Sequence, residues 1–173
     1  MMTMTKNRLT QAMREMRGDE TQQQMAMELN VSREAVTKYE GGARNIPQDI
    51  AQNLMAKHDN PRFALALRSQ YTKTGPMWLD GPNVDLHRSA VREKTLEEIK
   101  EAYEAIKALS FAQPFQSLSS WHSPQIEKVL EEAVEAITSL EHLVVVVCEE
   151  ASISYNETWH KHHIQLRSKG YLQ

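Results

Sequence analysis

The stretch that most constrains the fold is residues 21–42, TQQQMAMELNVSREAVTKYEGG. Thr21 is followed three residues later by Gln24, the spacing of a capping box at the start of a helix. Asn30 falls where this helix must turn, and asparagine tolerates the left-handed conformation better than most residues. Ser32 then caps a second helix, which the glycine pair ends. The stretch therefore predicts two short helices joined by a sharp turn.

The residues on either side of this pair extend the helical pattern. An apolar stripe in the preceding segment predicts a helix before Gly18, and Pro47 suits the first turn of another helix. After the break at Asn60–Pro61, the string RFALALRSQY indicates a fifth helix. Residues 72–85 contain two Gly and two Pro among polar residues and are typical of a loop or linker. The first block is therefore a four- or five-helix domain.

The second half has three helix starts of its own. Thr95 and Glu98 form a capping-box pattern, Ser123–Pro124 is a cap followed by proline, and Ser154 with Glu157 opens a last helix that ends near Gly170. The run LVVVVC at 143–148 contains four consecutive valines, but the helical period continues through it. The second half therefore reads as a helical hairpin or bundle.

Composition agrees with an all-α fold. Hydrophobic residues make up 40% of the 173 residues, with only six Gly and six Pro. The single Cys148 excludes an internal disulfide framework and fits a reducing cytoplasm. No secretory signal is recognisable, and LVVVVC is far too short to cross a bilayer. We expect a DNA-binding domain at 1–71, a linker at 72–94 and a helical domain at 95–173.

Residues 5–58 resemble the helix-turn-helix domain of the lambda-repressor-like, or XRE, regulators of bacteria and phages. The strings that carry the resemblance are LTQAMREMRG, TQQQMAMELNVSREAVTKYEGG and the helix that begins at Pro47. The sequence departs from the family pattern where Asn30 replaces the usual glycine and Tyr39 the usual aliphatic residue. The resemblance implies a lambda-repressor-like DNA-binding fold, in which Arg14 and Glu40 form a buried structural ion pair.

The resemblance also implies which residues meet DNA. Gln22 would grip a phosphate, the outer face of residues 33–40 would read base edges, and the residues after it would contact the backbone. Ala35 is small enough to touch a thymine methyl. The predicted DNA-binding residues are Gln22, Ser32, Arg33, Glu34, Ala35, Thr37, Lys38, Arg44 and Asn45.

The chemistry of these side chains is consistent with that assignment. Arg33 and Lys38 suit the O6 and N7 acceptors of guanine, and Glu34 can accept from cytosine N4. A single helix reads only a few base pairs, so such modules usually bind two half-sites as dimers. Residues 1–60 hold eight basic and eight acidic residues, so non-specific DNA binding should be weak.

The acidic C-terminal part suggests a partner surface. Residues 111–173 hold four Lys and Arg against eight Asp and Glu. A helix that is apolar all round at 144–147 needs burial on every side, which a second subunit would supply. We expect a homodimer through Ile137, Leu140, Val144 and Val147, and no membrane partner.

The function expected from the sequence is a dimeric transcriptional regulator. The family resemblance suggests a repressor of phage, prophage or mobile-element type that reads a palindromic operator. The alternative is an antitoxin or adaptor whose acidic helical half binds a protein partner, with DNA binding secondary. Self-association of the C-terminal part distinguishes the two functions, because the dimeric regulator requires it.

Other chemistry has weaker support. His160 and His163 share a helical face and, with His162, form a cluster, but a solvated last helix explains them more simply than a metal site. No Gly-rich phosphate loop, G-x-S-x-G, HExxH or self-cleaving serine motif occurs, so we expect neither an enzyme nor a cofactor. The pairs Glu131–Glu132 and Glu149–Glu150 are expected to be solvated faces.

Overall fold

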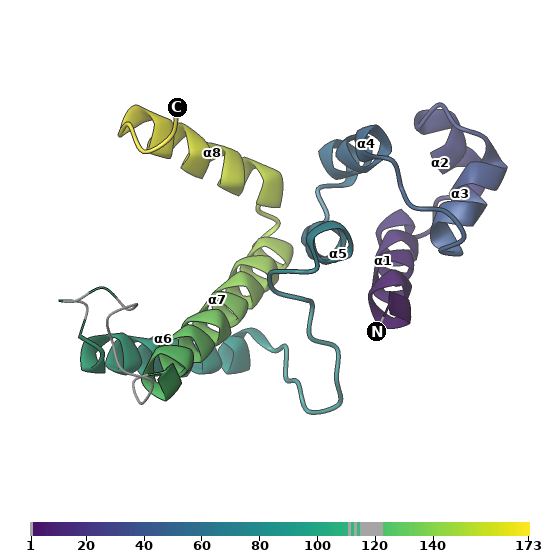
Figure 1. The fold of residues 1–173 in the computed structure, drawn as a ribbon. Coiled ribbons are helices and arrows are strands. Elements are labelled where there is room, and N and C mark those ends of the chain that lie inside the picture. Colours follow the sequence, from purple (N-terminus) through teal and green to yellow (C-terminus); the bar gives the residue numbers. More distant parts are fainter. Residues whose placement is uncertain (1, 111, 113, 115–122) are drawn as a thin grey trace. The chain divides into compact units, whose positions relative to one another are not determined.

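The protein is all-α in the part of the chain that the computed structural model describes, namely residues 2–110, 112, 114 and 123–173, with side chains from residue 8 onward. The helices are α1 (Met2–Arg17), α2 (Gln22–Glu28), α3 (Arg33–Glu40), α4 (Gln48–His58), α5 (Pro61–Thr72), α6 (Arg88–Ala108), α7 (Ser123–Ala151) and α8 (Tyr155–Ser168) (Figure 1). Of these described helices, none is long and apolar enough to cross a membrane.

The chain divides into two compact units. The first unit comprises residues 1–78 together with 151–173, and the second comprises residues 79–150. Helix α8 therefore groups with the N-terminal helices, whereas the sequence had suggested that it belongs with residues 95–173. The boundaries 1–71, 72–94 and 95–173 stay a prediction for independently folding segments.

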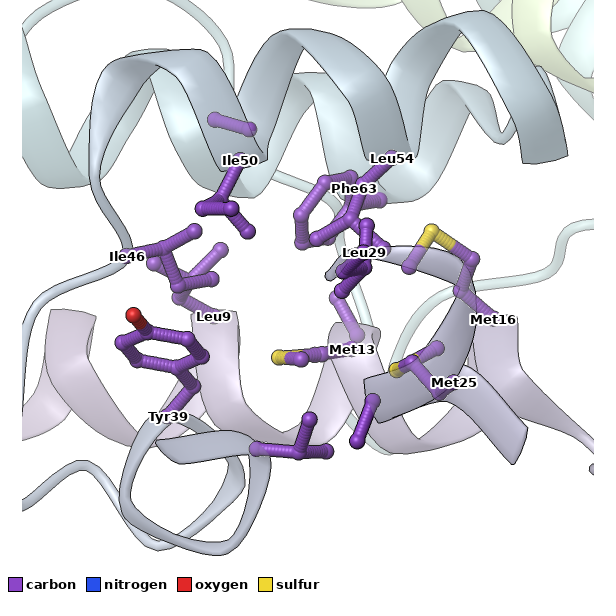
Figure 2. Packing of buried hydrophobic residues seen from close by; sticks show 14 residues of the cluster. Leu9, Met13, Met16, Met25, Leu29, Tyr39, Ile46, Ile50, Leu54 and Phe63 are labelled. Carbon is purple, nitrogen blue, oxygen red and sulfur yellow. The ribbon is translucent and has the colours of Figure 1, made fainter. Parts of the chain in front are cut away.

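The core of the first unit lies among α1 to α5. Met13, Met25 and Phe63 are fully buried, and they converge with Leu29 and Leu54 (Figure 2). Burying each large apolar side chain stabilises the fold by about 1.5–3 kcal/mol. The predicted stripe of α1 is confirmed, because Leu9 and Met16 join this cluster. This packing holds α3 at a fixed angle on the domain.

The turn chemistry predicted around α2 and α3 is confirmed. The Thr21 hydroxyl accepts from the backbone N–H of Gln24 at 3.2 Å, and the Gln24 side chain accepts from the backbone N–H of Thr21 at 2.8 Å. Asn30 has φ 53°, in the left-handed region. The Ser32 side chain accepts from the N–H of Ala35 at 3.2 Å. Local chemistry therefore sets both ends of the connection between α2 and α3.

Two predicted helix starts are corrected. Pro47 precedes α4 as its capping residue, with ψ 155°. Helix α6 begins at Arg88 after His87, so Thr95 lies inside the helix and does not cap its N-terminus. The buried Thr95 hydroxyl donates to the Val91 carbonyl at 2.7 Å. The Thr-x-x-Glu pattern was misleading because the helix-forming residues before Thr95 extend α6 by two turns.

Helix α8 is attached to the first unit through the end of α4. The Asn156 side-chain amide donates to the Met55 carbonyl at 2.7 Å, and its backbone N–H donates to the Asp59 carboxylate at 2.7 Å. Tyr155 is buried. The predicted cap of this helix is confirmed, because the Ser154 side chain accepts from the N–H of Glu157 at 3.0 Å.

The second unit is built around α6 and α7, which run antiparallel. The Thr95 hydroxyl approaches the Ser139 carbonyl at 3.2 Å, and Arg88 approaches Glu150 at 3.4 Å. Helix α7 is continuous through residues 143–148, so the helical interpretation of the valine run is confirmed. His142 is buried and its Nε2 accepts from the backbone N–H of Leu79 at 3.1 Å, which fixes the segment before α6.

Candidate nucleic-acid interface

The outer face of α3 presents a group of exposed polar side chains. Arg33, Glu34, Thr37 and Lys38 are all exposed, while Val36 and Tyr39 of the same helix are buried in the core. The alternation follows from the helical period, which turns one side of α3 inward. Four of the predicted DNA-binding residues therefore share one solvent-facing surface.

The cations on this surface are unpaired. No described carboxylate forms an ion pair with Arg33 or Lys38, and their side-chain nitrogens have no hydrogen-bond partner among the described residues. Arg44 lies just beyond the end of α3 with its guanidinium 5.9 Å from the centre of the Tyr39 ring, and the exposed Asn45 follows it. These positive groups remain available to an anionic partner.

Glu34 is the one acidic side chain of the predicted contact set. Hydrogen bonding from its own backbone N–H, and then the Ser32 hydroxyl, lowers the pKa of the Glu34 carboxyl, with smaller help from Arg33 and Lys38. The side chain therefore stays ionised at neutral pH. An ionised carboxylate repels phosphate but can accept a hydrogen bond from cytosine N4.

The predicted ion pair of Glu40 has a different basic partner. The Glu40 carboxylate, 3% exposed, is paired with Arg17, whose Nε lies 2.6 Å from Oε1. Arg14 instead donates to the Glu40 backbone carbonyl at 2.8 Å. The expectation of an Arg14–Glu40 pair is therefore wrong in its partner. Both arginines come from the last turn of α1, and their small separation in sequence made them hard to tell apart.

Gln22 belongs to the same network. Its side-chain N–H donates to Glu40 Oε2 at 2.7 Å, and its side-chain oxygen accepts from the Thr37 hydroxyl at 2.9 Å. Gln22 therefore ties α2 to α3, and Thr37 is partly engaged in the same contact. The family resemblance implies only a phosphate-binding role for Gln22, and this bridge could not be predicted from it. A residue that bonds both Glu40 and Thr37 sets the position of α3 on the domain.

Ala35 and Ser32 occupy less open positions than the charged residues. Ala35 is partly buried and packs against the hydrophobic core, so only part of its surface faces solvent. Ser32 is exposed, but its hydroxyl already caps α3. The surface therefore depends chiefly on Arg33, Glu34 and Lys38 of α3, with Arg44 and Asn45 beyond its end.

The second unit carries a different surface, which is apolar. Of the four residues predicted at a dimer interface, Ile137, Leu140 and Val147 are 41–54% exposed, whereas Val144 is half-buried. Leu130 and Val134 of the same helix, α7, are exposed as well, and so are Leu96, Ile99, Tyr103 and Ile106 on α6. The spacing of these residues is helical, so each helix leaves an apolar stripe in solvent.

Two groups of side chains have the proximity that a metal ion needs. Glu98, Glu101, Glu132 and Glu135 form one group in the second unit, and Glu20, Glu28 and His58 form the other in the first. Lys57 already pairs with both carboxylates of the latter group. The His160, His162 and His163 side chains are exposed on α8 and belong to neither group; the rings of His162 and His163 lie near Trp159.

Glu132 corrects a sequence-based expectation. The pair Glu131–Glu132 was expected to be a solvated face, but Glu132 is only 4% exposed. A signal was present in the sequence: KTLEEIKEA at 94–102 and KVLEEAVEA at 128–136 follow one pattern, K-x-L-E-E-x-x-E-A. The repeat places Glu98 and Glu132 at matching positions of the two helices. The repeat within each helix does not by itself predict that Glu98 and Glu132 meet, because their proximity depends on how α6 and α7 lie against each other.

Comparison with known proteins adds no relative: no family model, curated protein or solved structure matches the chain.

Proposed function

We propose that the protein is a sequence-specific DNA-binding transcriptional regulator, with α3 as the helix that enters the major groove. The observation that carries the proposal is the exposed face of α3, where Arg33 and Lys38 pair with no carboxylate of the described residues. A lambda-repressor-like arrangement of α1 to α5, as the sequence resemblance implies, would present this face to DNA. The resemblance further suggests a repressor of phage, prophage or mobile-element type.

The charge distribution supports a specific rather than a general DNA binder. Residues 1–60 are neutral in total, but three of their acidic groups are already paired: Glu40 is buried against Arg17, and Glu20 and Glu28 pair with Lys57. Each phosphate contact by an unpaired cation steepens the slope of the logarithm of the binding constant against the logarithm of salt concentration by about 0.9. A few such contacts give weak non-specific affinity, so base contacts and dimerisation must supply the rest.

We propose further that two copies of the chain associate through the second unit. The exposed stripe containing Leu130, Val134 and Ile137 supports this, because large apolar side chains in water favour burial against a partner. A two-fold dimer would bind two half-sites about one helical turn apart. The site residues on DNA would be Arg33, Glu34, Lys38, Arg44 and Asn45, with Gln22 and Thr37 positioning α3.

The test of DNA binding is selection of bound duplexes from a random pool by the full-length protein at physiological salt. We expect an inverted repeat to be enriched. Arg33→Ala should then weaken binding to that duplex by about 1–3 kcal/mol, because a bidentate contact to guanine has that value. Anisotropy titration over a range of salt concentrations measures the loss. Lys100→Ala, which removes an exposed charge from α6, is the matched control and should bind like wild type.

The contrary outcomes separate DNA binding from dimerisation. Failure of a folded full-length protein to enrich any sequence would refute the regulator. Sedimentation then tests the dimer independently: Ile137→Glu should yield monomers, whereas Ile164→Glu on α8 should not. A wild-type monomer would instead favour the alternative, an antitoxin or adaptor whose apolar stripes on α6 and α7 receive a different protein.

A further inference from the structure

Four carboxylates converge between α6 and α7. Glu98 and Glu101 come from the first copy of the K-x-L-E-E-x-x-E-A pattern, and Glu132 and Glu135 come from the second. Because the helices are antiparallel, the two copies face each other with approximate two-fold symmetry. One oxygen from each of the four residues lies within 4.8 Å of the others. We call these four residues the carboxylate cluster.

The two inner members of the cluster are buried and incompletely bonded. Glu98 is 6% exposed and Glu132 is 4% exposed. In each case Oε1 pairs with the lysine four residues earlier, Lys94 at 2.7 Å from Glu98 and Lys128 beside Glu132. The other oxygen, Oε2, is buried in both residues and has no hydrogen-bond partner in the part of the chain that the structure describes. A buried carboxylate oxygen without a partner costs free energy, so this arrangement lacks a positive group.

The charges of the cluster also leave a deficit. Four carboxylates and two lysines sum to about two negative charges at neutral pH when all six groups are ionised. Two shared protons or one divalent cation would cancel the deficit. A cation held among the four carboxylates would supply the positive charge that Lys94 and Lys128, each on Oε1 of one glutamate, leave incomplete.

We propose that the carboxylate cluster binds one divalent cation of the hard, oxygen-preferring class that includes Mg²⁺, Mn²⁺ and Ca²⁺. All four ligands are carboxylates, which suit such ions and not the softer ones. Ligands on opposite sides of a hard cation stand roughly 4–5 Å apart, twice the usual bond of 2.0–2.6 Å. One oxygen of each residue already lies within 4.8 Å of the other three, so the cluster fits such an ion with little rearrangement.

A neighbouring cavity gives the cation a way in. It has a volume of about 300 Å³, and its lining includes Glu98, Glu135, Thr138 and His142. Two members of the cluster thus border open space where water can complete the coordination shell. The cation would join α6 to α7, and through these helices it would stiffen the apolar stripes on both.

The test is Mn²⁺ binding to the full-length protein after treatment with EDTA and its removal. Electron paramagnetic resonance of free Mn²⁺ reports uptake, and we expect one saturable site per chain with affinity at about millimolar or tighter. Mg²⁺ or Ca²⁺ should compete for it. The exposed residues Glu101 and Glu135 allow variants that fold: Glu101→Gln and Glu135→Gln should each weaken Mn²⁺ binding about tenfold or more.

Glu104→Gln is the matched control, because Glu104 is an exposed glutamate of the same helix outside the cluster. It should bind Mn²⁺ like wild type. A second readout is amide hydrogen exchange of α6 and α7, which Mn²⁺ should slow in the wild type but not in Glu135→Gln. The proposal is overturned if the wild type shows no saturable Mn²⁺ site. It also fails if Glu101→Gln and Glu135→Gln bind as tightly as the wild type, since protons would then hold the cluster.

Discussion

The two units each bury carboxylates, but the hydrogen bonding of these carboxylates differs between the units. Glu40 in the first unit receives hydrogen bonds on both oxygens, from Arg17 at 2.6 Å and from Gln22 at 2.7 Å. Glu98 and Glu132 in the second unit each have one lysine on Oε1 and no partner on Oε2. The Glu40 carboxylate is hydrogen-bonded on both oxygens, whereas Glu98 and Glu132 each keep one oxygen that no described residue bonds.

This difference teaches how to separate structural from functional charge. Glu40 holds α1, α2 and α3 together, and so it stabilises the surface on which Arg33 and Lys38 are displayed. The carboxylate cluster holds like charges near one another, and no described side chain hydrogen-bonds Oε2 of Glu98 or Glu132. A satisfied buried charge indicates architecture, and an unsatisfied one indicates a place for something else.

The largest expected effect is at Glu40. Glu40→Ala should lower the free energy of unfolding of the first unit by about 3–5 kcal/mol, because it leaves Arg17 and Gln22 without their partner. Urea denaturation with hydrogen exchange of α1 to α3 measures the loss. Glu34→Ala on the exposed face of α3 is the control and should change stability by less than about 0.5 kcal/mol. Equal losses in the two variants would contradict the structural role of Glu40.

Removal of carboxylates from the cluster should have the opposite sign. In protein freed of divalent cations, the double variant Glu101→Gln with Glu135→Gln should slow hydrogen exchange of α6 and α7, since it relieves repulsion. Partial desolvation, and then the nearby Glu98 and Glu132, raises the pKa of the Glu135 carboxyl, which predicts a pH dependence as well. The contribution of Glu135 to stability is greatest below the ordinary pKa of 4.5 and is lost as pH rises through the raised pKa. The double variant should flatten this dependence; faster exchange than wild type at pH 7 would contradict the repulsion.

The smallest expected effect concerns His58 in the first unit. Burial, and then Lys57, lowers the pKa of the His58 imidazole from 6.5. The unfolded chain therefore takes up the proton more readily, and stability is lost as pH falls from 6.5 through the lowered pKa. Hydrogen exchange of α4 at pH 7 and pH 5 measures this loss, and His58→Gln should reduce it. His160→Gln, an exposed imidazole on α8, should leave it unchanged; a matching reduction there would remove His58 as the cause.

These two pH effects have opposite directions, which sharpens the comparison between the units. Acid weakens the first unit through His58, while it relieves the second through Glu135. A single pH titration of the full-length protein, followed by hydrogen exchange, should therefore show α4 and α7 changing in opposite senses.

Several elements of the fold could be predicted from the sequence because their causes are local. The capping box of Thr21 and Gln24, the left-handed turn at Asn30 and the caps at Ser32 and Ser154 each depend on residues within three positions of one another. The exposed face of α3 followed from the helical period in the same way. The start of α6 was missed because Thr95 and Glu98 match the local pattern of a cap without being one.

Partners at long range could not be predicted, because they depend on how helices pack. Nothing in the sequence distinguishes Arg14 from Arg17 as the partner of Glu40, and nothing near Asn156 points to the Met55 carbonyl. The same holds for the carboxylate cluster. The sequence shows the spacing of the glutamates within each helix, but it does not show that the two helices lie side by side.

The sequence by itself determined the helical class, the caps and the set of residues on the outer face of α3, since period and turn chemistry act over a few residues. Tertiary structure alone decided that Gln22 and Arg17 secure Glu40, that α8 belongs to the first unit, and that Glu98, Glu101, Glu132 and Glu135 meet. The physical reason is that burial and charge pairing are properties of positions in space, and packing brings together residues that the chain keeps apart.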